Sequence, residues 1–158
     1  MIQAITETNL TTFLQTEDNR INSTVSSSKI RHLIKFTNDM KGGSELGELY
    51  AYGKTETIYN RYTKFTFDYN ALPDRQSHFK NCCLLASGYW KYEVYEVSWI
   101  GEVTLTETTA PRSETDVLPV EDNHGVVQGL VTKGKMNVSD KAGTEQVQYT
   151  QRQEPDAN

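Results

Sequence analysis

The sequence has few cysteines, few prolines and no long apolar segment. Its two cysteines, Cys82 and Cys83, are adjacent. Neighbouring residues of a strand point to opposite faces, so a disulfide between them would be strained. The three histidines stand apart, without the spacing of zinc ligands. No apolar run approaches the roughly 18 residues that span a membrane. We therefore expect no redox site, no metal ion, no cofactor and no membrane insertion.

Positive charge is also scarce. The formal net charge is -5, and lysine and arginine are scattered without forming a basic run. Because nucleic-acid binding needs clustered positive charge, we expect no nucleic-acid partner. The first 20 residues are polar and include Glu7, Glu17 and Asp18, which is not the pattern of a secretion signal. We expect the chain to be made in a cytoplasm.

The motifs of common catalytic sites are absent or poorly placed. Ser26 and Lys29 have the Ser-x-x-Lys spacing of some acyl-transfer enzymes, but they lie in a serine-rich stretch with no helix to orient them. There is no Gly-x-Ser-x-Gly motif, phosphate loop or dinucleotide fingerprint. A carboxylate pair such as Asp68 and Glu93 could meet across strands, yet charged residues are ordinary on a solvated sheet face. We predict no catalytic residues and no enzyme.

Aromatic residues and period-two alternation are what the chain does have. The nine Tyr, five Phe and two Trp can build a core. Residues 63–69 place Phe65, Phe67 and Tyr69 on one face and polar residues on the other, which is typical of a half-buried antiparallel strand. Residues 89–100 form the longest β pattern. Its apolar side changes near Glu96, which predicts either a β-bulge or a strand buried on both faces.

The rest of the chain predicts further short strands. We expect them at residues 1–13, 30–36, 49–52, 81–86, 102–107, 126–138 and 144–150. Residues 15–29 are predicted to be a loop, residues 56–62 a short helical turn, and residues 139–143 a turn.

These elements predict an all-β fold, an antiparallel β-sandwich of immunoglobulin-like architecture with an extended C-terminal arm. The Cys…Trp…Cys spacing of true immunoglobulin domains is missing. The sandwich domain would comprise residues 1–107, and residues 1–29 could instead form an N-terminal arm. Residues 108–123, with Pro111 and Pro119, are predicted to be a linker or long loop. Residues 124–158 are predicted to hold C-terminal strands and the arm.

An aromatic cluster on the longest strand is the candidate interface. Because its residues alternate between faces, one face belongs to the core. The other could contact a second subunit, bind a sugar or be covered by the core as well. Val147 and Tyr149 share one face of the last predicted strand. The candidate interface residues are Tyr89, Trp90, Tyr92, Tyr95, Trp99, Val147 and Tyr149.

Five segments carry a resemblance to a known group of proteins. They are residues 34–40 (IKFTNDM), 60–65 (NRYTKF), 88–96 (GYWKYEVYE), 134–138 (GKMNV) and 143–149 (GTEQVQY). Together they resemble small β-rich virion-associated proteins of aquatic tailed bacteriophages. The resemblance covers most of the chain from Ile30 onward and is weaker in residues 1–29 and 108–123. The motifs mark strands and turns and carry over no functional residue.

The resemblance implies a structural protein of a virion assembled in the host cytoplasm. The expected role is a surface capsid decoration or head-fibre-type subunit. Its expected partners are other virion proteins, namely copies of itself and the major capsid protein. A tail or adaptor component is the first alternative. A carbohydrate-binding module that recognises a host-surface glycan is the second, and it requires an exposed Trp90 or Trp99.

Overall fold

The structure is a computed structural model that describes residues 2–6, 8–39, 48–59, 61–68, 87–106, 108–119 and 123–139. This part of the chain contains eight strands and two single-turn 3-10 helices, at Glu17–Asn19 and Ser27–Lys29. The strands are β1 (Ile2–Ile5), β2 (Leu10–Leu14), β3 (Ile30–Asn38), β4 (Glu48–Tyr52), β5 (Thr55–Ile58), β6 (Thr63–Phe67), β7 (Gly88–Ser98) and β8 (Val126–Ser139). The described residues form no helix that is long and apolar enough to cross a membrane.

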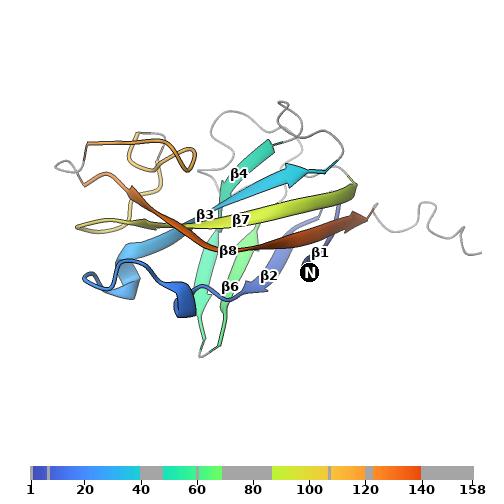
Figure 1. The fold of residues 1–158 in the computed structure, drawn as a ribbon, viewed down its shortest axis with the longest axis horizontal. Helices are drawn as coiled ribbons and strands as arrows, with labels where there is room; N and C mark the ends of the chain where they lie inside the picture. The colour runs from blue at the N-terminus through green and yellow to red at the C-terminus, as the bar shows by residue number, and fades with distance from the viewer. Residues whose placement is uncertain are drawn as a thin grey trace, which may run out of the picture.

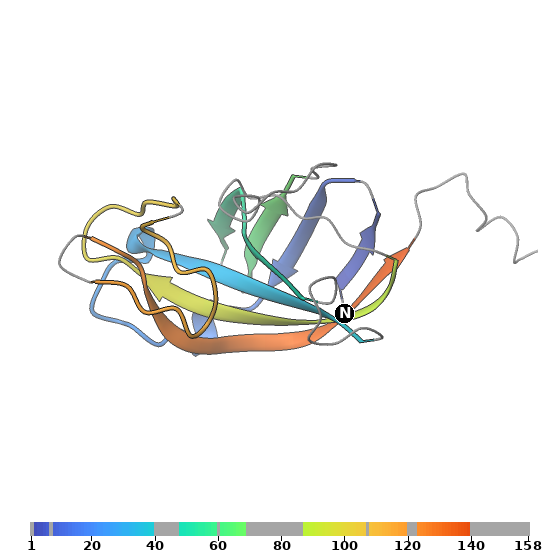
Figure 2. The same cartoon turned by 90° about the horizontal axis from the view of Figure 1, so that it is seen from above.

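The strands form two sheets that lie face to face as two layers (Figures 1 and 2). One sheet has five strands in the order β1-β8-β7-β3-β4, and the other has three in the order β2-β6-β5. Neighbouring strands are antiparallel except β1 and β8, which are parallel. The all-β sandwich predicted from the sequence is confirmed, with this one parallel pair in an otherwise antiparallel arrangement.

The main core lies between the two sheets. The alternation of β6 directs Phe65 and Phe67 into it, and both are fully buried. Phe67 meets Phe36 of β3 edge to face, with ring centroids 6.0 Å apart. Burying each such ring contributes about 1.5–3 kcal/mol. These contacts join the sheets across the middle of the molecule.

A second apolar cluster covers the outer face of the five-stranded sheet, which points away from the three-stranded sheet. Leu33 of β3, Val97 of β7 and Trp99, which directly follows β7, pack here with Tyr52 and Ala110. The covering segment, residues 99–119, passes over one end of the long strands (Figure 1). Residues 108–123 are predicted to be a linker or long loop. In the described part of this stretch, Ala110 packs in the cluster, and the Tyr52 and Tyr50 hydroxyls donate to the Pro111 carbonyl and to Glu114, so this part is packed on the sheet.

Two explanations were open for the change of apolar side near Glu96, and burial on both faces is the one that applies to this strand. The register between β7 and β8 shifts between Val94 and Tyr95 and again between Glu96 and Val97. Val94 faces the main core, whereas Val97 faces the outer cluster. The extra residue at each shift, Val131 and Gln128, belongs to β8, and the pairing of β7 with β3 is unbroken. The central strand β7 is therefore regular and buried on both faces.

The loop of residues 15–29 covers the far end of the inner face. Glu96, which is fully buried, accepts hydrogen bonds from the backbone N–H groups of Ile21 (3.0 Å) and Asn22 (2.7 Å). A carboxylate that accepts backbone N–H bonds can remain buried because its lone pairs are satisfied. This loop is thus fixed to the sheet by polar contacts.

Four local predictions need correction or lie outside the described residues. Residues 56–62 were predicted as a helical turn, but residues 55–58 form strand β5, because β-branched Thr and Ile pair well with β6. Residues 102–106 form no strand, since Val103 and Leu105 pack on the outer cluster from a loop. The predicted strands at 81–86 and 144–150 lie outside the described residues.

The described part of the C-terminal segment is built into the sheet. Strand β8 lies between β1 and β7 and pairs with both. Met136 and Val138 are buried in the main core. Residues 140–158, on which an extended arm depends, lie outside the described residues.

Gly125 gives a direct test of the packing between β8 and the outer cluster. A Cβ atom at this position would lie 2.7 Å from Trp99 Cζ2 and 2.9 Å from Pro111 Cδ. Since both neighbours are held in the packed loop, we expect Gly125→Ala to lower the free energy of unfolding by about 1–3 kcal/mol in urea denaturation. The exposed control Ser23→Ala should change it by less than about 0.5 kcal/mol. Equal stability of the two variants would contradict the tight packing.

Candidate functional site: an exposed aromatic hairpin

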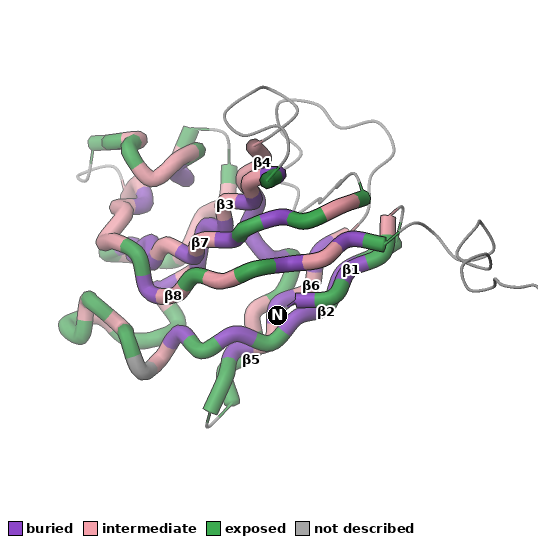
Figure 3. Tube along the Cα trace, turned by 45° about the vertical axis from the view of Figure 1, so that its right-hand side comes forward, coloured by how far each residue is buried: buried purple, intermediate pink, exposed green. Residues whose placement is uncertain are grey.

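Four large side chains are exposed together at the turn between β5 and β6 and on the adjoining β2. The exposed fractions are 54% for Phe13, 44% for Ile58, 46% for Tyr59 and 41% for Tyr62. Phe13 points outward because its neighbours in β2, Thr12 and Leu14, occupy the inward positions. We call these four residues the hairpin surface. Figure 3 shows the described residues on both sides of this turn coloured as exposed.

The aromatic rings of the hairpin surface contact one another. Tyr62 meets Phe13 edge to face, with centroids 5.1 Å apart, and lies 5.5 Å from the ring of Tyr59. Ile58, Tyr59, Arg61 and Tyr62 line a hollow of about 450 Å³. Tyrosine and arginine beside apolar groups are the residue types enriched in protein interfaces. The surface therefore has the composition of a protein contact site.

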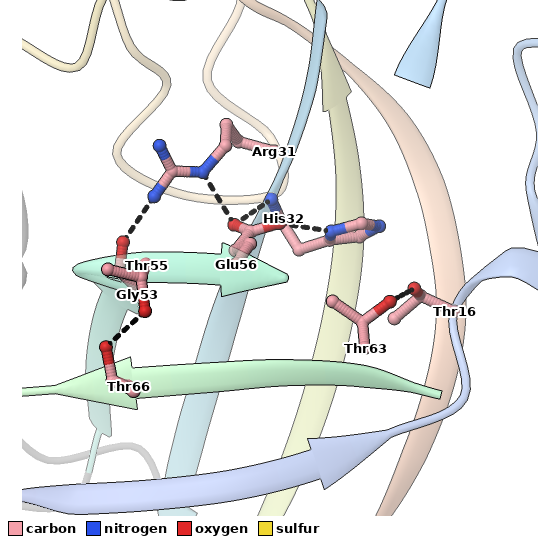
Figure 4. A network of polar contacts seen from close by, with 8 residues as sticks. All are labelled: Thr16, Arg31, His32, Gly53, Thr55, Glu56, Thr63 and Thr66. Carbon is pink, nitrogen blue, oxygen red and sulfur yellow. Dashed lines mark hydrogen bonds and ion pairs between the residues drawn. The ribbon is translucent and has the colours of Figure 1, made fainter. Parts of the chain in front are cut away.

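Hydrogen bonds fix the hairpin from its base to its tip. Thr55 and Thr66 share a hydroxyl bond of 2.6 Å across β5 and β6, and the Tyr59 N–H donates to the carbonyl of Tyr62 at 2.8 Å. At the start of β6, the Thr63 hydroxyl bonds to that of Thr16 at 2.8 Å inside the protein. Figure 4 shows the two threonine pairs. The aromatic tip is thus carried on a braced scaffold.

Glu56 joins the hairpin to the other sheet. Its Oε2 accepts bonds from Arg31 Nε and from the backbone N–H of His32, both at 2.9 Å, and its Oε1 lies 2.8 Å from His32 Nδ1. Arg31 also donates to the carbonyl of Gly53. The side chains of His32 and Glu56 are only 4% and 5% exposed. These contacts, drawn in Figure 4, connect β5 with β3.

The charge of Glu56 is stabilised in place. Burial by itself raises the pKa of this carboxyl group, but the charge of His32, its hydrogen bonds and the charge of Arg31 together outweigh burial. The pKa of Glu56 is therefore below its usual 4.5. The Glu56 carboxylate thus remains ionised at neutral pH, and its contacts with Arg31 and His32 hold the hairpin in one position. A surface fixed before binding loses little conformational entropy when a partner docks.

Most of the predicted aromatic interface lies inside the protein. Trp90, Tyr92 and Trp99 are 2%, 8% and 1% exposed, because the central strand β7 is covered on both faces. Tyr95 is half-buried, and its hydroxyl donates to Glu93 Oε1 at 2.8 Å. Among the predicted interface residues that the structure describes, Tyr89 alone is exposed, at 63%. Val147 and Tyr149 lie outside the described residues.

The burial of both indoles bears on the carbohydrate alternative. That alternative required an exposed Trp90 or Trp99, and each is buried in an apolar cluster of this chain. Neither indole can form a platform for a sugar ring while the sandwich is folded.

The weak catalytic candidates are not brought together. Asp68 pairs with Lys54 at 2.9 Å beside the three-stranded sheet, whereas Glu93 lies on the five-stranded sheet. Ser26 bonds to Ser28 at 2.8 Å, and Lys29 Nζ donates to the carbonyl of Ile100 at 3.0 Å. Within the described ranges, no three His, Cys, Asp or Glu side chains are grouped to hold a metal ion.

The hairpin surface was not among the predicted interface residues, although two sequence patterns point to it. Ile58, Tyr59 and Tyr62 lie in a segment predicted to be a turn, and large apolar residues in a turn have no strand face to bury them. Phe13 occupies an outward-facing position in a strand whose residues alternate between buried and exposed. Both patterns indicate exposed apolar residues, which mark contact sites when they gather in one patch.

No protein-family model, curated protein or solved structure matches this chain.

Proposed function

We propose that this chain is a structural subunit of a tailed-phage virion, a surface capsid decoration or head-fibre-type protein that acts through protein–protein contacts. The observation that carries the proposal is the hairpin surface, a cluster of exposed aromatic and apolar side chains on a braced hairpin. The all-β sandwich and the resemblance noted in the sequence also support it. The binding partners of this subunit would be other copies of the chain and the major capsid protein.

The hairpin surface suits a repeated assembly energetically. Completing the burial of four half-exposed side chains would contribute about 1 kcal/mol each, since full burial of such a side chain contributes roughly 1.5–3 kcal/mol. A contact of this size is weak alone. On a particle that presents many equivalent sites, several such contacts made at once give stable attachment.

The proposal predicts that particle incorporation depends on the tyrosines of the hairpin surface. We expect the wild-type chain to be abundant in purified particles, in a fixed ratio to the shell protein. The double variant Tyr59→Ser/Tyr62→Ser should be reduced about tenfold or more, because each lost aromatic contact weakens attachment. Quantitative mass spectrometry of particles, compared with the lysate, measures both. Tyr89→Ser, an exposed tyrosine elsewhere on the molecule, is the matched control.

The result also separates the alternatives. Absence of the wild-type chain from particles would contradict the virion role. A low copy number, in multiples of about three or six, would place it in the tail or an adaptor instead of the head. Incorporation of the double variant at the wild-type level would contradict the role of the hairpin surface.

A further inference from the structure

One side of the sandwich ends in a strand edge with no strand partner among the described residues. In the three-stranded sheet, β2 pairs only with β6. The backbone groups on the other side of β2 therefore meet no strand in the described part of the chain. An open edge of this kind is a template on which another extended segment can add by backbone hydrogen bonds.

A groove runs along this edge. It has a volume of about 260 Å³ and is lined by residues 11–14 of β2 together with Ile2 and Gln3 of β1 and Tyr92 of β7. Ile2 and Tyr92 are main-core residues that are 6% and 8% exposed. The groove thus reaches the edge of the core between the two sheets. An added strand could bury apolar side chains there at every second position.

The sequence that follows β8 has this pattern. Residues 144–150 (TEQVQYT) place Val147 and Tyr149 on one side, with Gln146 and Gln148 on the other. Strand β8 ends at Ser139, whose carbonyl accepts the N–H of Thr6 at 2.9 Å, next to the connection from β1 to β2. The chain after Ser139 therefore starts at the same side of the sandwich as the open edge of β2.

We infer that the open edge of β2 binds residues 144–150 of a second copy of this chain as an added β-strand, with Val147 and Tyr149 in the groove beside Ile2 and Tyr92. Backbone hydrogen bonds to β2 would supply part of the affinity, and burial of the two apolar side chains the rest. This self-association does not depend on the proposed virion role.

The second copy is favoured over the chain's own segment for a topological reason. The chain passes from β1 in one sheet to β2 in the other on this side of the molecule. To reach the outer edge of β2, the same chain would have to cross over that connection, and protein folds avoid crossed connections at one sheet edge. A neighbouring copy has no such constraint. Reciprocal exchange between copies also closes into a dimer or ring.

The test compares two double variants of the full chain that add the same charge to opposite sides of the segment. Val147→Asp/Tyr149→Asp would place carboxylates in the groove, whereas Gln146→Asp/Gln148→Asp would place them on the solvent side. Light scattering after size exclusion gives the mass of each species in solution. Hydrogen exchange reports the protection of the β2 amides that do not bond to β6.

We expect the wild-type chain and the Gln146→Asp/Gln148→Asp variant to be oligomeric with protected β2 amides. The Val147→Asp/Tyr149→Asp variant should be monomeric, with protection of those amides reduced about tenfold or more. A wild-type chain that is monomeric, with or without protected β2 amides, would overturn the inference that a second copy binds. An unchanged mass and unchanged protection in the Val147→Asp/Tyr149→Asp variant would overturn the assignment of residues 144–150.

Discussion

Glu56→Gln is expected to lower the free energy of unfolding by about 3 kcal/mol at pH 7, because breaking a buried ion pair from one side leaves its partners uncompensated. The Glu56 carboxylate accepts from Arg31 Nε, the His32 N–H and the His32 ring. A glutamine amide keeps one acceptor oxygen but turns an NH₂ group toward these donors. Urea denaturation measures the loss.

Glu48→Gln is the matched control for the loss of one negative charge. Glu48 is about one-third exposed, and its Oε2 lies 3.7 Å from Lys35 Nζ. A surface pair of this kind contributes about 0–1 kcal/mol. If Glu56→Gln were no more destabilising than Glu48→Gln, the network between β3 and β5 would not hold the sheets together.

Acid provides a second readout of the same residue. Because the pKa of Glu56 is lowered below 4.5 in the folded protein, its contribution is present above that pH and is lost as the pH falls through the lowered value. The stability of the wild-type chain should therefore approach that of Glu56→Gln below about pH 4.5. A constant difference between the two down to pH 2 would argue against an ionised Glu56.

The strands were the part of the fold that local pattern could predict. The alternation of residues 63–67 places Phe65 and Phe67 in the core as expected, and the change of apolar side near Glu96 indicates that β7 is buried on both faces. Side-chain period decides such features within a few neighbouring residues. Several short strands, each with at least one apolar face, predict a β-sandwich.

The site depends on contacts that are distant in sequence, which local pattern does not encode. Glu56 meets His32 only because β5 and β3 lie in facing sheets. From the sequence, Trp90 and Trp99 could each face either solvent or the core. The second sheet buries Trp90, and the covering loop buries Trp99. The hairpin surface was missed for the same reason, since the exposure of Tyr62 depends on the turn that carries it.

Tyr52 is expected to have the largest effect on the free energy of unfolding at high pH. Its side chain is fully buried, and its hydroxyl donates to the carbonyl of Pro111 at 2.6 Å. Burial first, and then the negative charges of Glu56 and Asp116, raise its pKa far above the usual 10.0. Below pH 10 the hydroxyl is protonated in both states. Above it the unfolded chain releases this proton and the folded chain does not, so stability falls by about 1.4 kcal/mol for each pH unit.

Tyr52→Phe should therefore make the stability curves of the two proteins cross. At pH 7 the variant should be less stable by about 1 kcal/mol, because the Pro111 carbonyl loses its donor. At pH 12 the wild-type chain should have lost about 2.7 kcal/mol through Tyr52, a loss that phenylalanine cannot incur. The variant should then be the more stable protein in urea denaturation. Tyr89→Phe, at an exposed position, should follow the wild-type curve. Parallel curves for Tyr52→Phe and the wild-type chain would show that the Tyr52 hydroxyl ionises without unfolding, and the loop at Pro111 would then not be closed over it.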